Sequence, residues 1–362
     1  MKKRACSIRI LILLGLFISA QQVGSACTTF CLKNSRDLIF GKNYDFPIGH
    51  GIVFVNKRGV SKAGFAWHKG QPLAWVSKYG SITFNQFGRD NPMGGVNERG
   101  LVVELMELRE TRYPDPDERP ALDNLEWIQY QLDKYSSVEE VLTHVDQIRM
   151  LPGIGLHFLL ADRSGATAGI EFLNGKAVYH NKEGMPLSVM TNSVYEESVR
   201  HVQQYEGFGG TKPLPLGSSS FDRFVRAAAM VNAYRPADSN APIDYAFAVL
   251  DSVRQRKGTK WSIVYDLKNM AVYFRTNIAS ERKEFSIDSF DFSCSSPVKM
   301  FDINDKRSGN VVQAFTDYEY EANRKLILMS YSETPFLQGV SLDVLESLAK
   351  HPEFSMCHTV QD

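Results

Sequence analysis

The sequence predicts an α+β fold in which antiparallel sheets are packed between layers of helices. Strand patterns come in groups joined by short polar turns, and helix patterns come in pairs between those groups. No repeat, low-complexity tract or Pro/Gly-rich linker divides the chain. We therefore expect a single domain over residues 27–362, preceded by an export signal over residues 1–26.

The strands are predicted from apolar runs that flank turn signals. Asn174 and Gly175 lie between two alternating apolar runs, and this dipeptide favours a tight hairpin turn. The segments that contain strands are residues 27–45, 94–108, 156–180 and 260–276.

Helices are predicted in the segments between these strand groups. Two helices lie within residues 121–148, and the second opens with a capping-box pattern from Ser136 to Glu139. Two more helices are expected at residues 218–234 and 241–255. Such alternation of strand groups and helix pairs is typical of layered α+β folds.

The first 26 residues have the layout of a secretory signal. Basic residues are followed by the apolar run ILILLGLFISA, and Gly24, Ser25 and Ala26 close the segment. Cleavage after Ala26 would make Cys27 the first residue of the mature chain. A lipoprotein signal usually has a large aliphatic residue where this chain has Gly24. We therefore expect an exported protein, periplasmic or secreted, with a free N-terminus at Cys27.

Charge and hydropathy exclude two classes of partner. The chain has 41 basic and 41 acidic residues, and loss of the four basic residues of the signal leaves 37 basic against 41 acidic, with no run of Lys or Arg. This balance argues against nucleic-acid binding. No later segment approaches the roughly 20 apolar residues of a membrane-spanning helix, so no membrane span is expected.

Four cysteines remain after the signal, and Cys27 is the one with distinctive chemistry. A free α-amine with a pKa of about 7.7 to 8.0 can act as a base toward the thiol of the same residue. Cys27 is therefore a candidate nucleophile that supplies its own base. The alternative, a small buried cysteine in a first strand, stays open for Cys27 and fits Cys31 better. Export permits one disulfide, and Cys294 with Cys357 is the favoured pair.

Other catalytic patterns are absent from the sequence. It contains no HExxH, paired CxxC, Walker loop, GxGxxG or GxSxG motif, and its eight histidines lack ligand spacing. We expect neither a metal nor an organic cofactor. His157, in the apolar run GLHFLLA, is expected to be a core histidine or one that supports a site residue. A Cys/His dyad stays open, but it leaves the position of Cys27 after a cleavage pattern unexplained.

Several motifs in order resemble the choloylglycine hydrolase family of linear amide hydrolases. They are the cysteine after the signal, FGKNYD, VNERGL, MTNS, DRFVR and WSIVYDLKNMAVYFRT, and they cover the chain from Cys27 to about Thr276. The family includes bile salt hydrolases and penicillin V acylases and is related to N-acylethanolamine amidases. The resemblance implies the N-terminal nucleophile fold, an αββα sandwich of two antiparallel sheets between helical layers. It also implies a small-molecule amide substrate with a large apolar acyl group, and a homotetramer.

The resemblance assigns roles to four residues. It implies Cys27 as the nucleophile, Asp45 in KNYD as the carboxylate that binds the α-amine, Asn192 in MTNS as an oxyanion donor and Arg223 in DRF as a site cation. These roles agree with the side chains, because a cation favours a thiolate and an amide can donate to a developing oxyanion. The alternatives are a turn residue at Asp45, a cap at Asn192 and a solvated helix charge at Arg223.

Two positions depart from the family pattern. Lys42 stands where FGRN usually has arginine, which keeps the charge but loses the planar fork of donors. Glu107 stands where bile salt hydrolases have asparagine and penicillin acylases have tyrosine. Its backbone N–H can still serve an oxyanion hole, whereas its carboxylate changes what the pocket tolerates. The competing hypothesis is an exported binding protein or lipoprotein that shares the fold without catalysing a reaction.

The aromatic-rich stretch over residues 64–84 is a candidate wall for an apolar pocket. It contains Phe65, Trp67, Trp75 and Tyr79, and ligand sites are commonly lined by such residues. The alternative for each is an ordinary core or sheet position.

Overall fold

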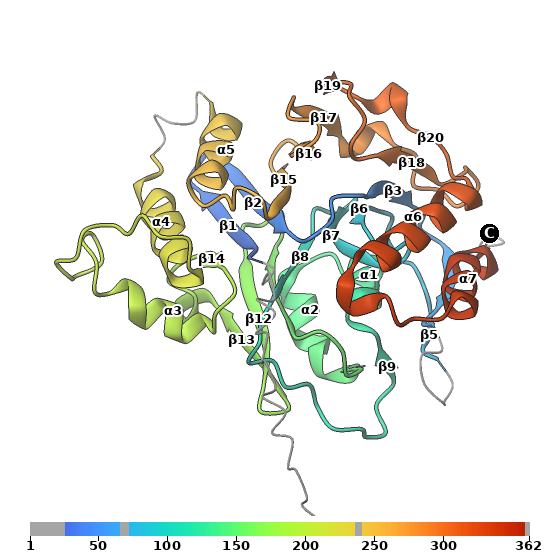
Figure 1. The fold of residues 1–362 in the computed structure, drawn as a ribbon, viewed down its shortest axis with the longest axis horizontal. Helices are drawn as coiled ribbons and strands as arrows, with labels where there is room; N and C mark the ends of the chain where they lie inside the picture. The colour runs from blue at the N-terminus through green and yellow to red at the C-terminus, as the bar shows by residue number, and fades with distance from the viewer. Residues whose placement is uncertain (1–25, 66–71, 236–240, 359–362) are drawn as a thin grey trace, which may run out of the picture.

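Two large β-sheets lie face to face in the computed structural model, which describes residues 26–65, 72–235 and 241–358. Helices cover their outer faces, so the layers run helix, sheet, sheet, helix (Figure 1). This arrangement confirms the predicted α+β sandwich. Residues 1–25 of the predicted export signal, and Trp67 of the aromatic-rich stretch, lie outside the described residues.

The first sheet has seven strands and contains the predicted N-terminal hairpin. Its turn is closed by Asn34, whose side-chain oxygen accepts two backbone N–H groups from the residues that follow. All neighbouring strands are antiparallel except the edge pair β17 and β19. Across the sheet the order is β14 (Val189–Met190), β1 (Thr28–Lys33), β2 (Leu38–Asp45), β15 (Thr259–Asp266), β16 (Ala271–Thr276), β17 (Lys283–Ser286) and β19 (Gly309–Asn310).

The second sheet has nine strands, and every neighbouring pair is antiparallel. Asn174 and Gly175 have φ values of 54° and 76°, which confirms the predicted tight turn. Across the sheet the order is β13 (Lys176–Asn181), β12 (Thr167–Leu173), β11 (Leu156–Ala161), β8 (Val102–Glu107), β7 (Pro92–Asn97), β6 (Ser81–Asn85), β3 (Ile52–Asn56), β18 (Lys299–Asp302) and β20 (Thr316–Asp317).

Buried side-chain bonds attach helices to both sheets. Asn43 of β2 donates to the carbonyl of Leu250 in α5, and Asn97 of β7 donates to the carbonyl of Leu132 in α1. No helix in the described ranges is both long and apolar enough to cross a membrane. The helices are α1 (Asn124–Lys134), α2 (Val138–His144), α3 (Tyr195–Val202), α4 (Ser220–Ala233), α5 (Pro242–Ser252), α6 (Tyr320–Glu333) and α7 (Leu342–Lys350).

The predicted capping box of α2 is wrong by one residue. Ser137 caps the helix, and its hydroxyl accepts the backbone N–H of Glu140 at 3.2 Å. The Glu140 carboxylate accepts the backbone N–H of Ser136 at 2.6 Å. Two serines followed by two glutamates fit the motif in either frame, so the spacing alone did not distinguish them.

One connected hydrophobic core joins both sheets to α1, α4, α5 and α7. A buried hydrogen bond also joins the two sheets, because the Tyr265 hydroxyl donates to the Glu104 carboxylate at 2.5 Å. The glycine at position 94 makes room for the Glu104 side chain, because a Cβ there would lie 2.2 Å from a Glu104 oxygen. Burial raises the pKa of Glu104 to about 7, against the lowering effect of Lys42.

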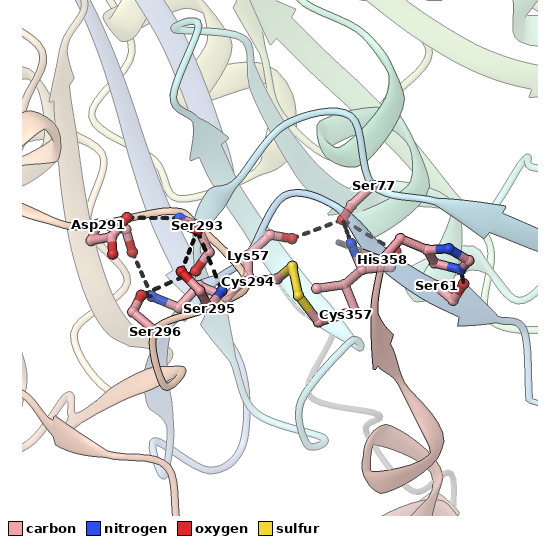
Figure 2. Close-up of a disulfide and its surroundings, with 11 residues drawn as sticks. Lys57, Ser61, Ser77, Asp291, Ser293, Cys294, Ser295, Ser296, Cys357 and His358 are labelled. Carbon is pink, nitrogen blue, oxygen red and sulfur yellow. Dashed lines mark hydrogen bonds between the residues drawn. A yellow bond between two sulfur atoms is a disulfide. The ribbon is translucent and has the colours of Figure 1, made fainter. Parts of the chain in front are cut away.

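The C-terminal segment, defined here as residues 312–358, is tied to the body of the molecule by a disulfide. Cys357 is bonded to Cys294, which confirms the pair favoured from the sequence (Figure 2). α6 and α7 lie on the opposite side of the molecule from α3 and α4 (Figure 1).

The remaining short elements are β4 (Val60–Ala63), β5 (Ala74–Val76), β9 (Ala121–Leu122), β10 (Arg149–Met150), β21 (Met356–Cys357) and the 3₁₀ helices η6 (Pro335–Leu337) and η7 (His351–Phe354). β21 pairs with β4 and β4 with β5 in a small sheet, whereas β9 and β10 form a parallel pair.

Candidate active site

Cys27 lies fully buried immediately before β1, beside the end of β2. The backbone N–H of Asp45 donates to Sγ at 3.5 Å, and Sγ lies 3.9 Å from the Asp45 carbonyl oxygen. The β1–β2 hairpin produces this contact, because Thr28 pairs with Asn43 and Cys27 therefore comes opposite Tyr44, next to Asp45. The structure thus brings together two of the residues predicted for the site.

The Asp45 side chain is 1% exposed. Burial raises the pKa of its carboxyl group to about 7, although a hydrogen bond from Thr259 and the charges of Arg223 and Lys42 lower it. A carboxyl group poised in this way can change protonation state near neutral pH, next to the backbone of the candidate nucleophile.

Arg223 of α4 connects the predicted nucleophile to the predicted oxyanion donor. Its Nη1 donates to the Cys27 carbonyl oxygen at 2.5 Å and to the Thr28 hydroxyl at 2.8 Å. Its Nη2 donates to Oδ1 of Asn192 at 2.9 Å. A planar guanidinium presents several donors in a fixed fork, so one side chain positions both segments.

The interpretation of Arg223 as a solvated helix charge is wrong, because the residue is only 2% exposed. Burial lowers its pKa, and the neighbouring charges of Asp45 and Cys27 oppose that effect. The helix begins just before it with a capping box, in which Ser219 and Asp222 exchange hydrogen bonds. This cap fixes the first turn of α4 and hence the direction from which the guanidinium enters the site.

The Asn192 side chain has its orientation set by two partners. Its Oδ1 accepts from Arg223, and its Nδ2 donates to the backbone carbonyl of Glu107 at 2.8 Å. Its backbone N–H donates to the Ser220 hydroxyl at 2.9 Å. An amide nitrogen carries two N–H donors, and the bond to Glu107 uses one of them. The interpretation of Asn192 as a helix cap is wrong, because Val194 is the N-cap of the following helix.

Sequence reasoning predicted that His157 lies in the core or supports a site residue, which its burial confirms, but it did not identify Glu171, the partner of His157 in the network that supports Asn192. His157 of β11 contacts the carbonyl of Thr191 through Nε2 at 2.7 Å and Glu171 through Nδ1 at 3.1 Å. Glu171 of β12 also accepts the backbone N–H of Tyr195 at 3.0 Å. The segment 191–195 is therefore held from both sides.

Two histidine partners lower the pKa of Glu171. Burial raises its pKa, but hydrogen bonds from His157 and His180 outweigh that effect and bring the pKa to about 2. The register of the β11–β12 hairpin is the signal that could have revealed the pairing of His157 with Glu171. Phe158 pairs with Ile170, so His157 and Glu171 come opposite each other on neighbouring strands.

Glu107 ends β8, and its backbone rather than its side chain makes the contact with the site. Its carbonyl accepts from Asn192, and in an extended strand the N–H of the same residue points to the same side. Its carboxylate lies 4.0 Å from Nε of the exposed Arg109. The side chain of the same strand that reaches β1 is Met106, whose sulfur accepts from the Thr29 hydroxyl at 2.8 Å.

Lys42 lies between the two sheets, fully buried. Its Nζ donates to the backbone carbonyl of Leu105 and lies 3.7 Å from the Glu104 carboxylate. The charge still lowers the pKa of Asp45. The direct contacts of Lys42 are with β8, so it joins the sheets and influences the site through its charge.

Phe65 and Trp75 of the aromatic-rich stretch pack against the C-terminal segment and α1, contrary to the expectation that they wall the site. Phe65 contacts the ring of His351 in the C-terminal segment, and Trp75 contacts Tyr130 and donates to Asp133 in α1. Within the described ranges, no group of three or more His, Cys, Asp or Glu side chains could hold a metal ion.

The chain matches a known group of enzymes. The family model of the linear amide C–N hydrolases, choloylglycine hydrolase family, matches residues 27–311. The chain belongs to the choloylglycine hydrolase family. The choloylglycine hydrolase match begins at the candidate nucleophile Cys27 and ends before the C-terminal segment.

Individual choloylglycine hydrolase relatives agree with this assignment. The penicillin V acylase of Pectobacterium atrosepticum is 29% identical over 250 residues, which are 57% of this chain and 66% of that protein, just under two thirds of its length. The structure of penicillin V acylase from Agrobacterium tumefaciens has a TM-score of 0.71 and 28% identity, and the match covers 81% of this chain and 98% of that one. The conjugated bile acid hydrolase of Clostridium perfringens, at 18% identity and a TM-score of 0.64, covers 78% of this chain and 98% of that one and shares the fold.

Proposed function

We propose that this chain is an exported amidase that hydrolyses linear amides by acyl transfer to Cys27. The observation that carries the proposal is the buried Arg223 guanidinium, which bonds both the Cys27 backbone and the Asn192 side chain. Membership of the linear amide C–N hydrolases supports the reaction class, and the start of the family match at Cys27 supports the choice of nucleophile.

The proposed nucleophile becomes active when the bond between Ala26 and Cys27 is cut. The new α-amine accepts the thiol proton, directly or through a water molecule, and the thiolate attacks the amide carbonyl. Asp45, next to the sulfur, orients the amine and balances its charge when it is protonated. The buried Cys31 is a poor alternative, because burial raises the pKa of its thiol to about 12.

The tetrahedral intermediate places a negative oxygen opposite Asn192 and Glu107. The second N–H of the Asn192 amide and the backbone N–H of Glu107 are the proposed oxyanion donors. Removing one such donor typically costs about 3 to 4 kcal/mol of transition-state stabilisation. Arg223 acts by holding the Asn192 amide with its nitrogen toward β8.

The cycle closes without a cofactor. Collapse of the intermediate breaks the C–N bond, and the leaving amine takes the proton from the α-ammonium of Cys27. Water, deprotonated by the same α-amine, attacks the Cys27 thioester, and the carboxylic acid leaves as the thiolate is released and reprotonated. Every proton in this scheme is donated and recovered by one residue.

We propose an amide with a large apolar acyl group as substrate and a homotetramer as the assembled form, by analogy with the family. Penicillin V and conjugated bile salts are the compounds named for the relatives above. N-acyl amino acids and acyl lactones belong in the same screen. The Arg109 guanidinium near the Glu107 carboxylate would weaken the repulsion that Glu107 exerts on an anionic substrate.

The decisive experiment combines the N-terminus with activity. Intact mass and N-terminal sequencing of protein purified from an exporting host should show a start at an unmodified Cys27. That protein should hydrolyse at least one amide of the screen. Cys27→Ala should lose at least 1,000-fold in kcat/KM, because removing a catalytic nucleophile can cost about a million-fold, and Cys31→Ala should keep its activity. A dead Cys31→Ala with an active Cys27→Ala would overturn the assignment.

The competing hypothesis, an exported binding protein or lipoprotein, makes the opposite prediction. It requires a blocked or lipid-modified Cys27, or a free one that hydrolyses none of the amides. The same mass measurement and the same screen therefore separate the two hypotheses.

A further inference from the structure

A chain of aromatic rings leads from the active site to the C-terminal segment. The rings of Tyr44 and Phe46, on either side of Asp45, stack at a centroid distance of 5.6 Å and an angle of 16°. Phe46 in turn meets Phe87 edge to face at 5.8 Å and Phe336 at 6.1 Å. Both edge-to-face distances lie in the range in which aromatic pairs attract.

The inner end of this chain lies beside the reacting sulfur. Because Thr28 pairs with Asn43, the positions one step outward, Cys27 and Tyr44, fall on the same face of the sheet. The Tyr44 hydroxyl donates to Gln86 at 2.7 Å, which fixes the ring. An acyl group bound to Cys27 would therefore lie next to the Tyr44 ring.

The outer end of the aromatic chain is formed by residues that lie beyond the family match. Phe336 lies in η6, and Tyr331 of α6 packs on Phe87 at 5.5 Å. A carboxylate oxygen of Glu333 lies 2.8 Å from Nε2 of His50, within hydrogen-bonding distance. The end of α6 and η6 thus hold the loop that follows Asp45 from outside.

The rings become more exposed along the chain. Tyr44 is 2% exposed, Phe46 is half-buried and Phe336 is 57% exposed. A large apolar ring that is exposed to water gains free energy when an apolar group covers it. The group placed to do so is the acyl part of a substrate whose carbonyl is at Cys27.

We propose that the C-terminal segment, through Phe336, completes the acyl-binding wall of the Cys27 site and selects amides with an aryl or medium-length alkyl acyl group. This inference rests on the proposed function for its substrate. Phe336 is a specificity residue in this scheme, because it contacts the acyl group at a distance from the bond that breaks.

The test compares Phe336→Ala with a matched control on three anilides, those of acetic, hexanoic and phenoxyacetic acid. In Phe336→Ala, kcat/KM for the hexanoyl and phenoxyacetyl anilides should fall about tenfold, mostly through KM, with less than about a twofold change for the acetyl anilide. The control is Phe354→Ala, a phenylalanine that is 75% exposed in η7 of the same segment and outside the ring chain. It should leave all three values within about twofold.

A binding measurement makes the test independent of turnover. The dissociation constant of phenoxyacetate, measured by calorimetry on the mature protein, should rise about tenfold in Phe336→Ala and stay unchanged in Phe354→Ala. Retained preference for the longer acyl groups in Phe336→Ala, equal losses in both variants, or no phenoxyacetate binding by the parent protein would overturn the inference. Selective loss of binding in a protein that cleaves no amide would support the wall and refute the proposed reaction.

Discussion

Asp45, beside the candidate nucleophile, makes the stability of the fold depend on pH. Its carboxyl group is buried beside Cys27, and its pKa rises from an ordinary 3.8 to about 7. A raised pKa means that the carboxyl group stabilises the fold fully only below about pH 3.8 and that this contribution is lost as the pH rises through 7. The residue is thus unfavourable for stability at a pH at which its carboxyl group is ionised, the state that the proposed mechanism requires.

We predict that Asp45→Asn separates these two effects. Its kcat/KM should fall at least about 100-fold, because the amide cannot balance the α-ammonium of Cys27. Its free energy of unfolding relative to the parent should increase between pH 4 and pH 8, by a few kcal/mol, since the variant has no carboxyl group to ionise in the interior. Urea titrations at several pH values measure this difference, and a constant or decreasing difference would contradict the prediction.

At the scale of elements, the segment that carries Asn192 depends on the β11–β12 hairpin. His157 and Glu171 lie opposite each other on these strands and bond the backbone on both sides of Asn192. The Glu171 pKa of about 2, below its ordinary 4.5, means that its contribution to stability is present above pH 4.5 and is lost as the pH falls toward 2. The hairpin therefore fixes the backbone on either side of Asn192, the proposed oxyanion donor.

We expect Glu171→Gln to lower the free energy of unfolding by about 3 kcal/mol at pH 7, a difference that shrinks as the pH falls from 4.5 toward 2. Its kcat should fall with little change in KM, because a displaced Asn192 affects the transition state more than binding. Glu183→Gln, at an exposed position of the same sheet region, is the control. Equal pH profiles of stability for the two variants would show that Glu171 does not act as an ionised anchor.

The elements that the sequence predicted correctly share one property. The hairpins at residues 27–45 and 156–180 are encoded by neighbouring residues, and both appear where expected. The capping error at Ser136 arose because two frames satisfied the same local rule. Local signals therefore predicted which elements exist more reliably than where one of them begins.

At the scale of the whole molecule, the candidate site joins residues that no local pattern connects. Arg223 and Cys27 are 196 positions apart in the chain, and Asn192 and Glu107 are 85 apart. Resemblance to a family supplied those positions, whereas their contacts required the structure. The resemblance does not extend to the C-terminal segment, so the packing of that segment against Phe46 and Phe87 could not be predicted.

The disulfide between Cys294 and Cys357 should stabilise the whole molecule measurably. It closes a loop of 63 positions that contains α6 and α7, and constraining an unfolded loop of that length is worth about 4 kcal/mol. Cys294→Ser should lower the urea midpoint, and dithiothreitol should lower the midpoint of the parent to a similar value. A parent protein that is insensitive to dithiothreitol, with the bridge shown to be reduced, would contradict this prediction.

The bonds that Arg223 makes have a consequence for activation. They end on the carbonyl of Cys27, the Thr28 hydroxyl and the Asn192 side chain, all on the far side of the peptide bond to Ala26, so none of them is broken or made when that bond is cut. Under the proposed mechanism the uncut chain is a zymogen whose catalytic geometry is already assembled. Activation then requires no refolding, and the rate at which activity appears after export equals the rate at which the peptidase exposes one amino group.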